Sequence, residues 1–360
     1  MATKPASAAT ANWSDILERQ GVGQAVDFLR TREGENLAER IQRLRVFDED
    51  YRADHLGEAI PKDRLHPKLH HPQLLDLWRA SHAQHIRPGD WVALDCNYAC
   101  EHMGTQPGAR RMLHDSGVSP AHVAWAGTDE NEFFYLPHGL LNHDARSLEE
   151  YVEHLSPDQA RMIEFGEEHS LARFDLEIER VREHVMKYHD ADACGVFHGP
   201  DHWTRVGVHA RNMARAHGVD PLVPTLFALV HDSQREDEGY DAEHGPRAAK
   251  FVLERRKDLF AFLRDDQIED LRVACDLHST GQVLGTAIQR CCWDADRLDL
   301  WRVGIEPNAA LLCHSESRKP SAIECARVLW EQHARDRGML SDERQDYIPE
   351  WSRATLRQGF

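Results

Sequence analysis

Histidine and aspartate residues recur in a fixed order along the second half of this chain. Six of them form the series: His202, His231, Asp232, His244, His278 and Asp296. Imidazole nitrogens and carboxylate oxygens suit Mn, Fe, Co, Ni and Zn without any cysteine. Because the chain has 24 His in 360 residues, a single histidine carries little weight, and the prediction rests on order and spacing. We predict that the six residues bind a divalent transition metal, with enough ligands for two ions.

The adjacent pair His231 and Asp232 has a special place in the series. The pair follows an apolar stretch that begins after Asp220 and Pro221 and has the spacing of a buried helix. Adjacent side chains on a helix point about 100° apart, but at a helix end both can reach one centre. We therefore predict that both residues reach the metal centre, where Asp232 can bridge two ions.

The first part of the chain mixes helical and extended patterns. Residues 13–45 have helical periodicity with a bend at 21–23, and runs at 91–94, 122–125 and 133–136 are typical of short β-strands. These runs predict a small mixed domain.

Beyond Pro137 the pattern becomes helical. Ser147 and Ser156 each begin a capping signal, with Glu150 and Gln159 three residues later. Further helices are predicted at 175–189, 202–217, from 220, and near 245–263, 266–279, 296–303 and 320–337.

These patterns predict an α+β protein in which an all-α domain follows a small mixed α/β domain. The length of the chain favours two domains over one. The predicted parts are a flexible tail at 1–12, the mixed domain at 13–145, the all-α domain at 150–340 and a C-terminal extension at 341–360.

Composition limits the partners. The net charge of −18 opposes non-specific binding to nucleic acid or anionic lipid, so a long nucleic acid is not an expected partner. No apolar run approaches the roughly 20 residues of a membrane span, and no apolar signal segment opens the chain. With 8 Cys spread through a long chain, we expect reduced thiols and a cytoplasmic protein without membrane association. The oligomeric state stays open.

The order of the predicted ligands resembles the HD-domain superfamily of metal-dependent phosphohydrolases. The resemblance covers about residues 175–310. The matching residues are His202, the pair His231 and Asp232, and Asp296 in an Ala-Asp-Arg-Leu context; His244 and His278 match the members that hold two metals. The resemblance implies an α-helical fold and hydrolysis of a phosphomonoester or phosphodiester of a small molecule such as a nucleotide. The Gly-Tyr-Pro signature of cyclic-dinucleotide hydrolases is absent after the His-Asp pair, which argues against that substrate.

The hypothesis assigns catalysis to Asp232 and His231, which would orient a nucleophile activated by two ions. Cationic groups outside the ligand set are also needed to bind phosphate, and arginine can pair with it in a bidentate manner. Three residues near the ligands in sequence are candidates for binding substrate: Arg235, Arg247 and His198.

Two alternatives stay open at this point. Asp294 competes with Asp296 for the last ligand position; we favour Asp296 because it directly precedes Arg297 and Leu298, as in the family, while Asp294 is placed to cap a helix. HD-type di-iron oxygenases use the same ligands to activate dioxygen. The bound metal and the consumption of dioxygen would separate the oxygenase from the hydrolase.

The N-terminal half resembles small ADP-ribosyltransferase-like domains. The resemblance rests on Tyr51-Arg52-Ala53 and on the stretches at 86–102 and 123–137. It implies that Arg52 supports the phosphates of NAD and that Glu132 bonds the ribose. The serine motif that usually lies between them is not evident. The alternative is a sensor or binding domain for NAD or a partner, with Glu132 at the start of a strand.

Overall fold

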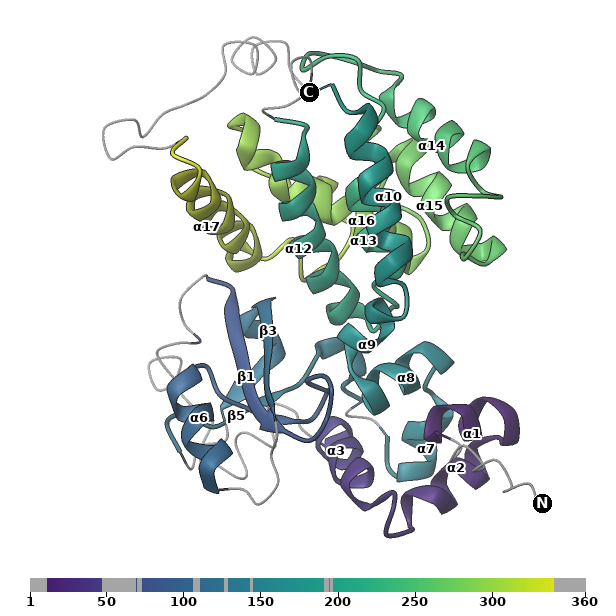
Figure 1. Ribbon diagram of the computed structural model, residues 1–360, viewed down its shortest axis with the longest axis vertical. Coiled ribbons are helices and arrows are strands. Elements are labelled where there is room, and N and C mark those ends of the chain that lie inside the picture. Colours follow the sequence, from purple (N-terminus) through teal and green to yellow (C-terminus); the bar gives the residue numbers. More distant parts are fainter. Residues whose placement is uncertain are drawn as a thin grey trace, which may run out of the picture.

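The computed structural model describes residues 12–46, 69, 73–105, 111–125, 129–142, 145–190, 194 and 197–339. The fold is α+β and mainly helical, as predicted: a large group of helices lies beside a small unit with two β-sheets (Figure 1). The predicted tail, apart from Asn12, and the predicted extension at 341–360 lie outside the described residues.

Three short helices open the described chain: α1 (Trp13–Gln20), α2 (Val22–Leu29) and α3 (Glu35–Val46). The predicted bend falls at Gly21, whose φ of 86° lies in the region that favours glycine. The apolar sides of these helices pack with α7 (Leu148–Glu153) and α8 (Pro157–Phe165) in one core. The capping signals at Ser147 and Ser156 predicted these two helices, and the capping box is complete at α8. The predicted boundary at 145–150 separated both helices from the core that they join.

The β unit has two antiparallel sheets. One pairs β1 (Leu75–Ser81) with β3 (Arg111–Val118), and the other has the order β2 (Trp91–Val92), β5 (Phe133–Tyr135) and β4 (Val123–Trp125). The backbones of Trp78 and Ala93 exchange two hydrogen bonds of 2.8 Å, which join the sheets. Helix α6 (Cys96–Thr105) packs on β1. The three predicted runs all contain strands, whereas β1 and β3 were not predicted.

The remaining described helices form the group that carries the six predicted ligands. In chain order they are α9 (Glu167–Ala172), α10 (Asp175–Tyr188), α12 (Pro200–His217), α13 (Leu222–Val230), α14 (His244–Glu254), α15 (Asp265–Leu277), α16 (Ala287–Leu298), the 3₁₀ turns η4 (Asp299–Val303) and η5 (Ala309–Leu311), and α17 (Pro320–Asp336).

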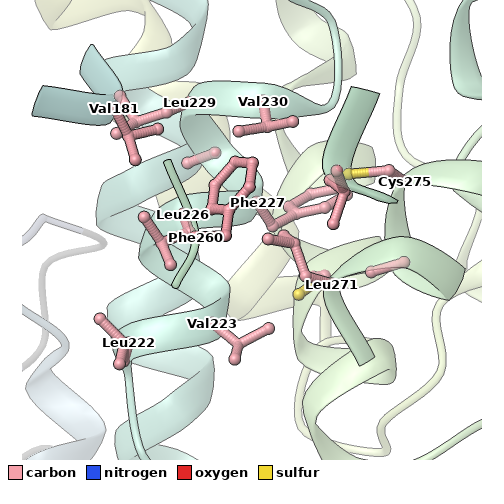
Figure 2. Packing of buried hydrophobic residues seen from close by; sticks show 14 of the residues in the cluster. Val181, Leu222, Val223, Leu226, Phe227, Leu229, Val230, Phe260, Leu271 and Cys275 are labelled. Atoms are coloured by element: carbon pink, nitrogen blue, oxygen red, sulfur yellow. The ribbon is translucent and has the colours of Figure 1, made fainter. Parts of the chain in front are cut away.

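Helix α13 lies in the middle of this group (Figure 1), and its side chains are almost entirely buried. Figure 2 shows Phe227 and Leu226 surrounded by apolar residues of other elements, among them Val181 of α10 and Leu271 of α15. Burying a side chain of this size contributes about 1.5–3 kcal/mol. This packing fixes the end of α13, where His231 follows.

Two helix boundaries differ from the prediction. The helix predicted at 245–263 ends at Glu254, and turns follow it. The helix predicted at 296–303 begins at Ala287 instead, because Thr286 and Gln289 form a complete capping box. Asp296 therefore lies near the end of a longer helix, not at the start of a short one.

Helix α12 also holds the β unit in place. Arg215, which is buried, pairs with Asp115 of β3 at 3.1 Å and with Glu167 of α9. Asn212 accepts a hydrogen bond from the backbone of Ser119 at 3.0 Å and donates one to the carbonyl of Gly117 at 2.8 Å. The helix that begins beside His202 therefore ends against the sheet.

All eight cysteines are free thiols in this structure. None of the helices within the described ranges combines the length and the apolar content of a membrane span.

Candidate metal centre

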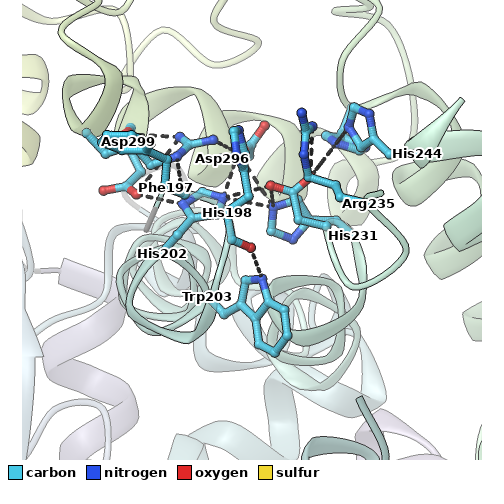
Figure 3. A network of polar contacts seen from close by, with 12 residues as sticks. Phe197, His198, His202, Trp203, His231, Arg235, His244, Asp296 and Asp299 are labelled. Carbon is cyan, nitrogen blue, oxygen red and sulfur yellow. Dashed lines mark hydrogen bonds and ion pairs between the residues drawn. The ribbon is translucent and has the colours of Figure 1, made fainter. Parts of the chain in front are cut away.

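The six predicted ligands lie together in the interior of the helical group. His202 is in the first turn of α12, His231 and Asp232 follow α13, and His244 begins α14. His278 follows α15 directly, and Asp296 lies near the end of α16. All six are buried, and Figure 3 shows those that it labels turned toward one another.

Four of these residues form one half of the site. Nε2 of His202 lies 3.0 Å from Nε2 of His231 and 3.5 Å from Oδ2 of Asp232. Oδ1 of Asp296 lies 3.4 Å from Nε2 of His202 and 3.7 Å from Nε2 of His231. Two imidazole nitrogens and two carboxylate oxygens therefore surround one point.

The second half uses the other oxygen of the same aspartate. Nε2 of His244 lies 2.8 Å from Nε2 of His278. These two nitrogens lie 3.4 Å and 3.6 Å from Oδ1 of Asp232. The carboxylate of Asp232 thus stands between the two histidine pairs with one oxygen toward each.

The backbone sets which ring nitrogen faces the centre. Nδ1 of His231 lies 3.1 Å from the carbonyl of Phe227, and Nδ1 of His278 lies 2.7 Å from the carbonyl of Cys275. Nδ1 of His244 contacts the carbonyl of Asp241. A carbonyl only accepts hydrogen bonds, so each Nδ1 donates, and a neutral ring then presents the lone pair of Nε2 to the centre.

In each facing pair of histidines, the pKa of one ring is lowered and the pKa of the other is raised. Burial lowers the pKa of His231 to about 3 and that of His244 to about 4. Burial also opposes the charge of His202, but the carboxylates around it, chiefly Asp232 and Asp296, raise its pKa to about 9. The pKa of His278 is raised against burial in the same way by Asp232. Without an ion, one proton therefore lies between the Nε2 atoms of His202 and His231 near pH 7.

The donor set fits divalent transition metals. Two Nε2 lone pairs at hydrogen-bonding distance need a cation between them, either a proton or a metal ion. Within the described part of the chain, Oδ1 of Asp296 is buried and accepts no hydrogen bond, although it points to this centre. The groups His202–His231–Asp232 and Asp232–His244–His278 could each hold a metal ion. Histidine nitrogens with carboxylate oxygens suit Mn, Fe, Co, Ni or Zn.

Three residues that support the ligands were missed by the sequence analysis. Asp299 lies 2.7 Å from Nδ1 of His202 and accepts two hydrogen bonds, of 2.7 and 2.9 Å, from Arg205. Arg302 pairs with Asp296 at 3.8 Å and donates to the carbonyl of Phe197. Asp299 follows Asp296 by three residues, and this helical spacing was the signal that could have found it.

Asp294, the competitor of Asp296, faces away from the centre into another network. It accepts hydrogen bonds from the backbone of Cys313 at 2.6 Å and of His314 at 3.0 Å, and its Oδ2 lies 2.9 Å from Nδ1 of His314. It therefore anchors the segment after η5 rather than capping a helix. The geometry places Asp296, not Asp294, beside the histidines.

The three candidates for binding substrate lie at different places. Arg235 is 3.7 Å from Oδ1 of Asp232 and also donates to the carbonyls of Asp237 and Gly239. His198 is buried four residues before His202, in the segment that precedes α12, and the two ring centroids are 6.4 Å apart. Both residues therefore border the centre.

Arg247 is turned away from the ligands. It pairs with Asp241 and donates to the carbonyl of Gln234 at 2.9 Å. Because the carbonyl of Asp241 receives Nδ1 of His244, Arg247 supports the loop that orients this ligand.

The N-terminal candidates are not brought together. Arg52 lies outside the described residues. Glu132 immediately precedes β5 and lines a cavity of the β unit that shares no residue with the metal centre.

A scan of protein-family models, a search of curated proteins and a search of solved structures found no match to this chain.

Proposed function

We propose that this protein is a dinuclear metal-dependent phosphohydrolase of the HD type, acting on a phosphomonoester or phosphodiester of a small molecule, with a nucleotide as the favoured class. The observation that carries the proposal is the position of Asp232, whose two oxygens each face one histidine pair. A bridging carboxylate between two nitrogen-rich sites is what a two-ion centre requires. When bound, two ions would supply Lewis acidity and lower the pKa of coordinated water.

Charge balance supports an anionic substrate. The carboxylates of Asp232, Asp296 and Asp299 lie among the guanidinium groups of Arg205, Arg235 and Arg302. The three negative charges and the three positive charges cancel, and Glu238 adds one negative charge near His198. Divalent ions would therefore leave a positive excess, which a phosphate ester can neutralise.

His198 is placed to act on the substrate. Its Nδ1 lies 2.7 Å from Oε2 of Glu238, and its carbonyl accepts a hydrogen bond of 2.8 Å from the indole of Trp203. The carboxylate of Glu238 accepts from Nδ1, so Nε2 of the neutral ring carries the lone pair and can accept a hydrogen bond from the substrate. Burial lowers the pKa of His198, so the ring is neutral near pH 7. We assign His198 to accepting a hydrogen bond at Nε2 from a hydroxyl group of the substrate.

The test is hydrolysis of a panel of nucleotide phosphoesters by protein loaded separately with Mn, Fe, Co, Ni or Zn. We expect release of phosphate or of a nucleoside monophosphate with at least one metal, and loss of turnover by about 10³-fold or more in Asp232→Ala. Asp294→Asn is the matched control, because this buried aspartate of α16 pairs with His314 and contacts no predicted ligand. Dioxygen consumption by the iron form, with no hydrolysis by any form, would favour the oxygenase instead.

A further inference from the structure

Two cysteines of helix α6 place their sulfur atoms side by side on the β unit. Cys96 and Cys100 are four residues apart, and their Sγ atoms lie 4.0 Å from each other. Residues at this spacing share one face of a helix. Cys100 is exposed and Cys96 is half-buried, and both are free thiols. The pair therefore offers two sulfur donors to a ligand that arrives from solvent.

The fold sets the spacing of the two sulfurs before any ligand arrives. Helix α6 packs on β1 and β3 (Figure 1), and Ala99, which lies between the two cysteines in sequence, is buried. Asp95 caps the start of the helix, because its Oδ1 accepts hydrogen bonds from the backbone of Asn97 at 2.8 Å and of Tyr98 at 3.1 Å. A ligand that uses both sulfurs would therefore not have to order the first turn of the helix.

Helical geometry disfavours a disulfide within the pair. A disulfide needs Cβ atoms about 3.5–4.5 Å apart, whereas residues four apart on a helix hold theirs about 5–6 Å apart. Partial burial, Cys100 and Asp95 also raise the pKa of Cys96, so the thiolate that would start oxidation is scarce near pH 7. We therefore expect both thiols to stay reduced and available to a cation.

An ion between the two sulfurs fits where a direct bond does not. Metal–thiolate bonds of about 2.3 Å let one ion connect sulfurs up to about 4.6 Å apart, and the observed 4.0 Å falls within this reach. Thiolates select soft ions such as Cu(I) and zinc. Within the described part of the chain, the groups of three or more possible ligands lie at the metal centre, and neither includes these cysteines. A site with two donors suits Cu(I), which accepts few ligands, better than zinc, which takes four.

We propose that Cys96 and Cys100 bind one Cu(I) ion between their sulfur atoms. Each thiol gives its proton to solvent and a sulfur lone pair to the ion, and no electron is transferred. Because Cys100 is exposed, the ion can enter and leave from solvent. The pair shares no residue with the metal centre, and the proposal is independent of the proposed hydrolase activity.

The test is an anaerobic titration of the full, reduced chain with Cu(I), in competition with a chromophoric Cu(I) chelator. We expect one ion per chain, with an affinity that falls by roughly 10²-fold or more in Cys96→Ser and in Cys100→Ser, because each variant keeps one of two linked donors. Cys325→Ser, which changes a half-buried cysteine of α17, is the matched control and should bind Cu(I) like the unaltered protein. Zinc binding should be the same in Cys96→Ser as in the unaltered protein.

X-ray absorption at the copper edge identifies the ligand atoms, and we expect two sulfur neighbours. Circular dichroism checks that the variants fold. The proposal is overturned if the unaltered protein holds no Cu(I) against the chelator, or if the bound copper has no sulfur neighbours. It is also overturned if folded Cys96→Ser and Cys100→Ser bind Cu(I) like the unaltered protein, or if Cys96→Ser weakens zinc binding as much as Cu(I) binding.

Discussion

The carboxylate of Asp299 lies 2.7 Å from Nδ1 of His202, across the imidazole ring from the nitrogen that faces the metal centre. Burial opposes the negative charge of Asp299, but Arg205 and His202 lower its pKa, so the carboxylate is ionised and accepts a hydrogen bond from Nδ1 of His202. The ring is thereby held in the tautomer whose Nε2 can bind a metal, and its basicity is increased.

Removing this charge should weaken metal binding. Asp299→Asn keeps the shape of the side chain but leaves Arg205 without its counter-charge, so both stability and metal affinity should fall, the affinity by about 10–100-fold. Asp294→Asn removes an equally buried carboxylate that contacts His314 instead of a ligand. It should lower stability and leave metal affinity unchanged. Equal metal affinities of the two variants, measured by competition with a chelator, would refute this role.

Binding of metal should release protons. Without an ion, His202 has a pKa of about 9 and therefore carries a proton at pH 7, which a metal must displace. We expect release of at least one proton per chain when the centre fills, and an apparent affinity that rises with pH up to about 9. Calorimetry at pH 7 in two buffers with different ionisation enthalpies measures this number. Identical heats in the two buffers would show that no proton is displaced.

Gly245 allows α14 to approach α15 closely. A Cβ at Gly245 would lie 2.9 Å from the carbonyl oxygen of Cys275, closer than real Cβ contacts allow, and a tight 3.0 Å from that of Asp276. Gly245→Ala should therefore cost about 1–3 kcal/mol. It should also separate His244 from His278, so that the protein binds one ion fewer.

Gly207→Ala is the control for this change, because its Cβ would meet only the Cβ of Ala228 at an ordinary 3.8 Å. It should keep the full metal content and be as stable as the unaltered protein or slightly more so. Full metal content in Gly245→Ala, measured by elemental analysis, would contradict the close packing.

Acid should destabilise the fold through His217, whose ring stacks on His314 with the centroids 3.6 Å apart. Burial and then His314 lower the pKa of His217 to about 4, below the value of about 6.5 in an unfolded chain. The unfolded state therefore takes up the proton first. This contribution to stability is fully present above pH 6.5 and is lost as the pH falls to 4.

His217→Phe keeps a ring in the stack but cannot be protonated. Between pH 6.5 and 4 it should lose about 1–2 kcal/mol less stability than the unaltered protein, allowing for partial solvent screening. Urea unfolding of both chelator-treated proteins across this range measures the difference. Parallel pH profiles would rule out His217 as the source.

The sequence predicted that these six residues lie together, because their order and spacing along the chain, not any single histidine, carried the prediction. The residues that support these six could not be predicted in this way. Asp299, Arg205 and Arg302 are common charged residues, and their roles depend on which helices cross. Arg235 and Arg247 show the limit of proximity in sequence, because one borders Asp232 and the other turns to Asp241.

The sheets could be predicted only in part, because contacts between residues far apart in the sequence are not visible in local composition. The runs at 91–94, 122–125 and 133–136 are rich in aromatic and β-branched residues, and they contain β2, β4 and β5. Strands β1 and β3 include charged residues, and β3 has Asp115, Ser116 and Gly117, which are poor strand formers. Their pairing with each other, over six residue pairs, stabilises them in a way that local composition does not reveal.

The central claim is that Asp232 joins two metal sites built from His202, His231, His244, His278 and Asp296. Elemental analysis of metal-loaded, desalted protein tests it most directly. The account predicts about two transition-metal ions per chain in the unaltered protein, about one in His278→Ala and almost none in Asp232→Ala. Absence of bound metal in the folded, unaltered protein, or an unchanged metal content in folded Asp232→Ala, would contradict it.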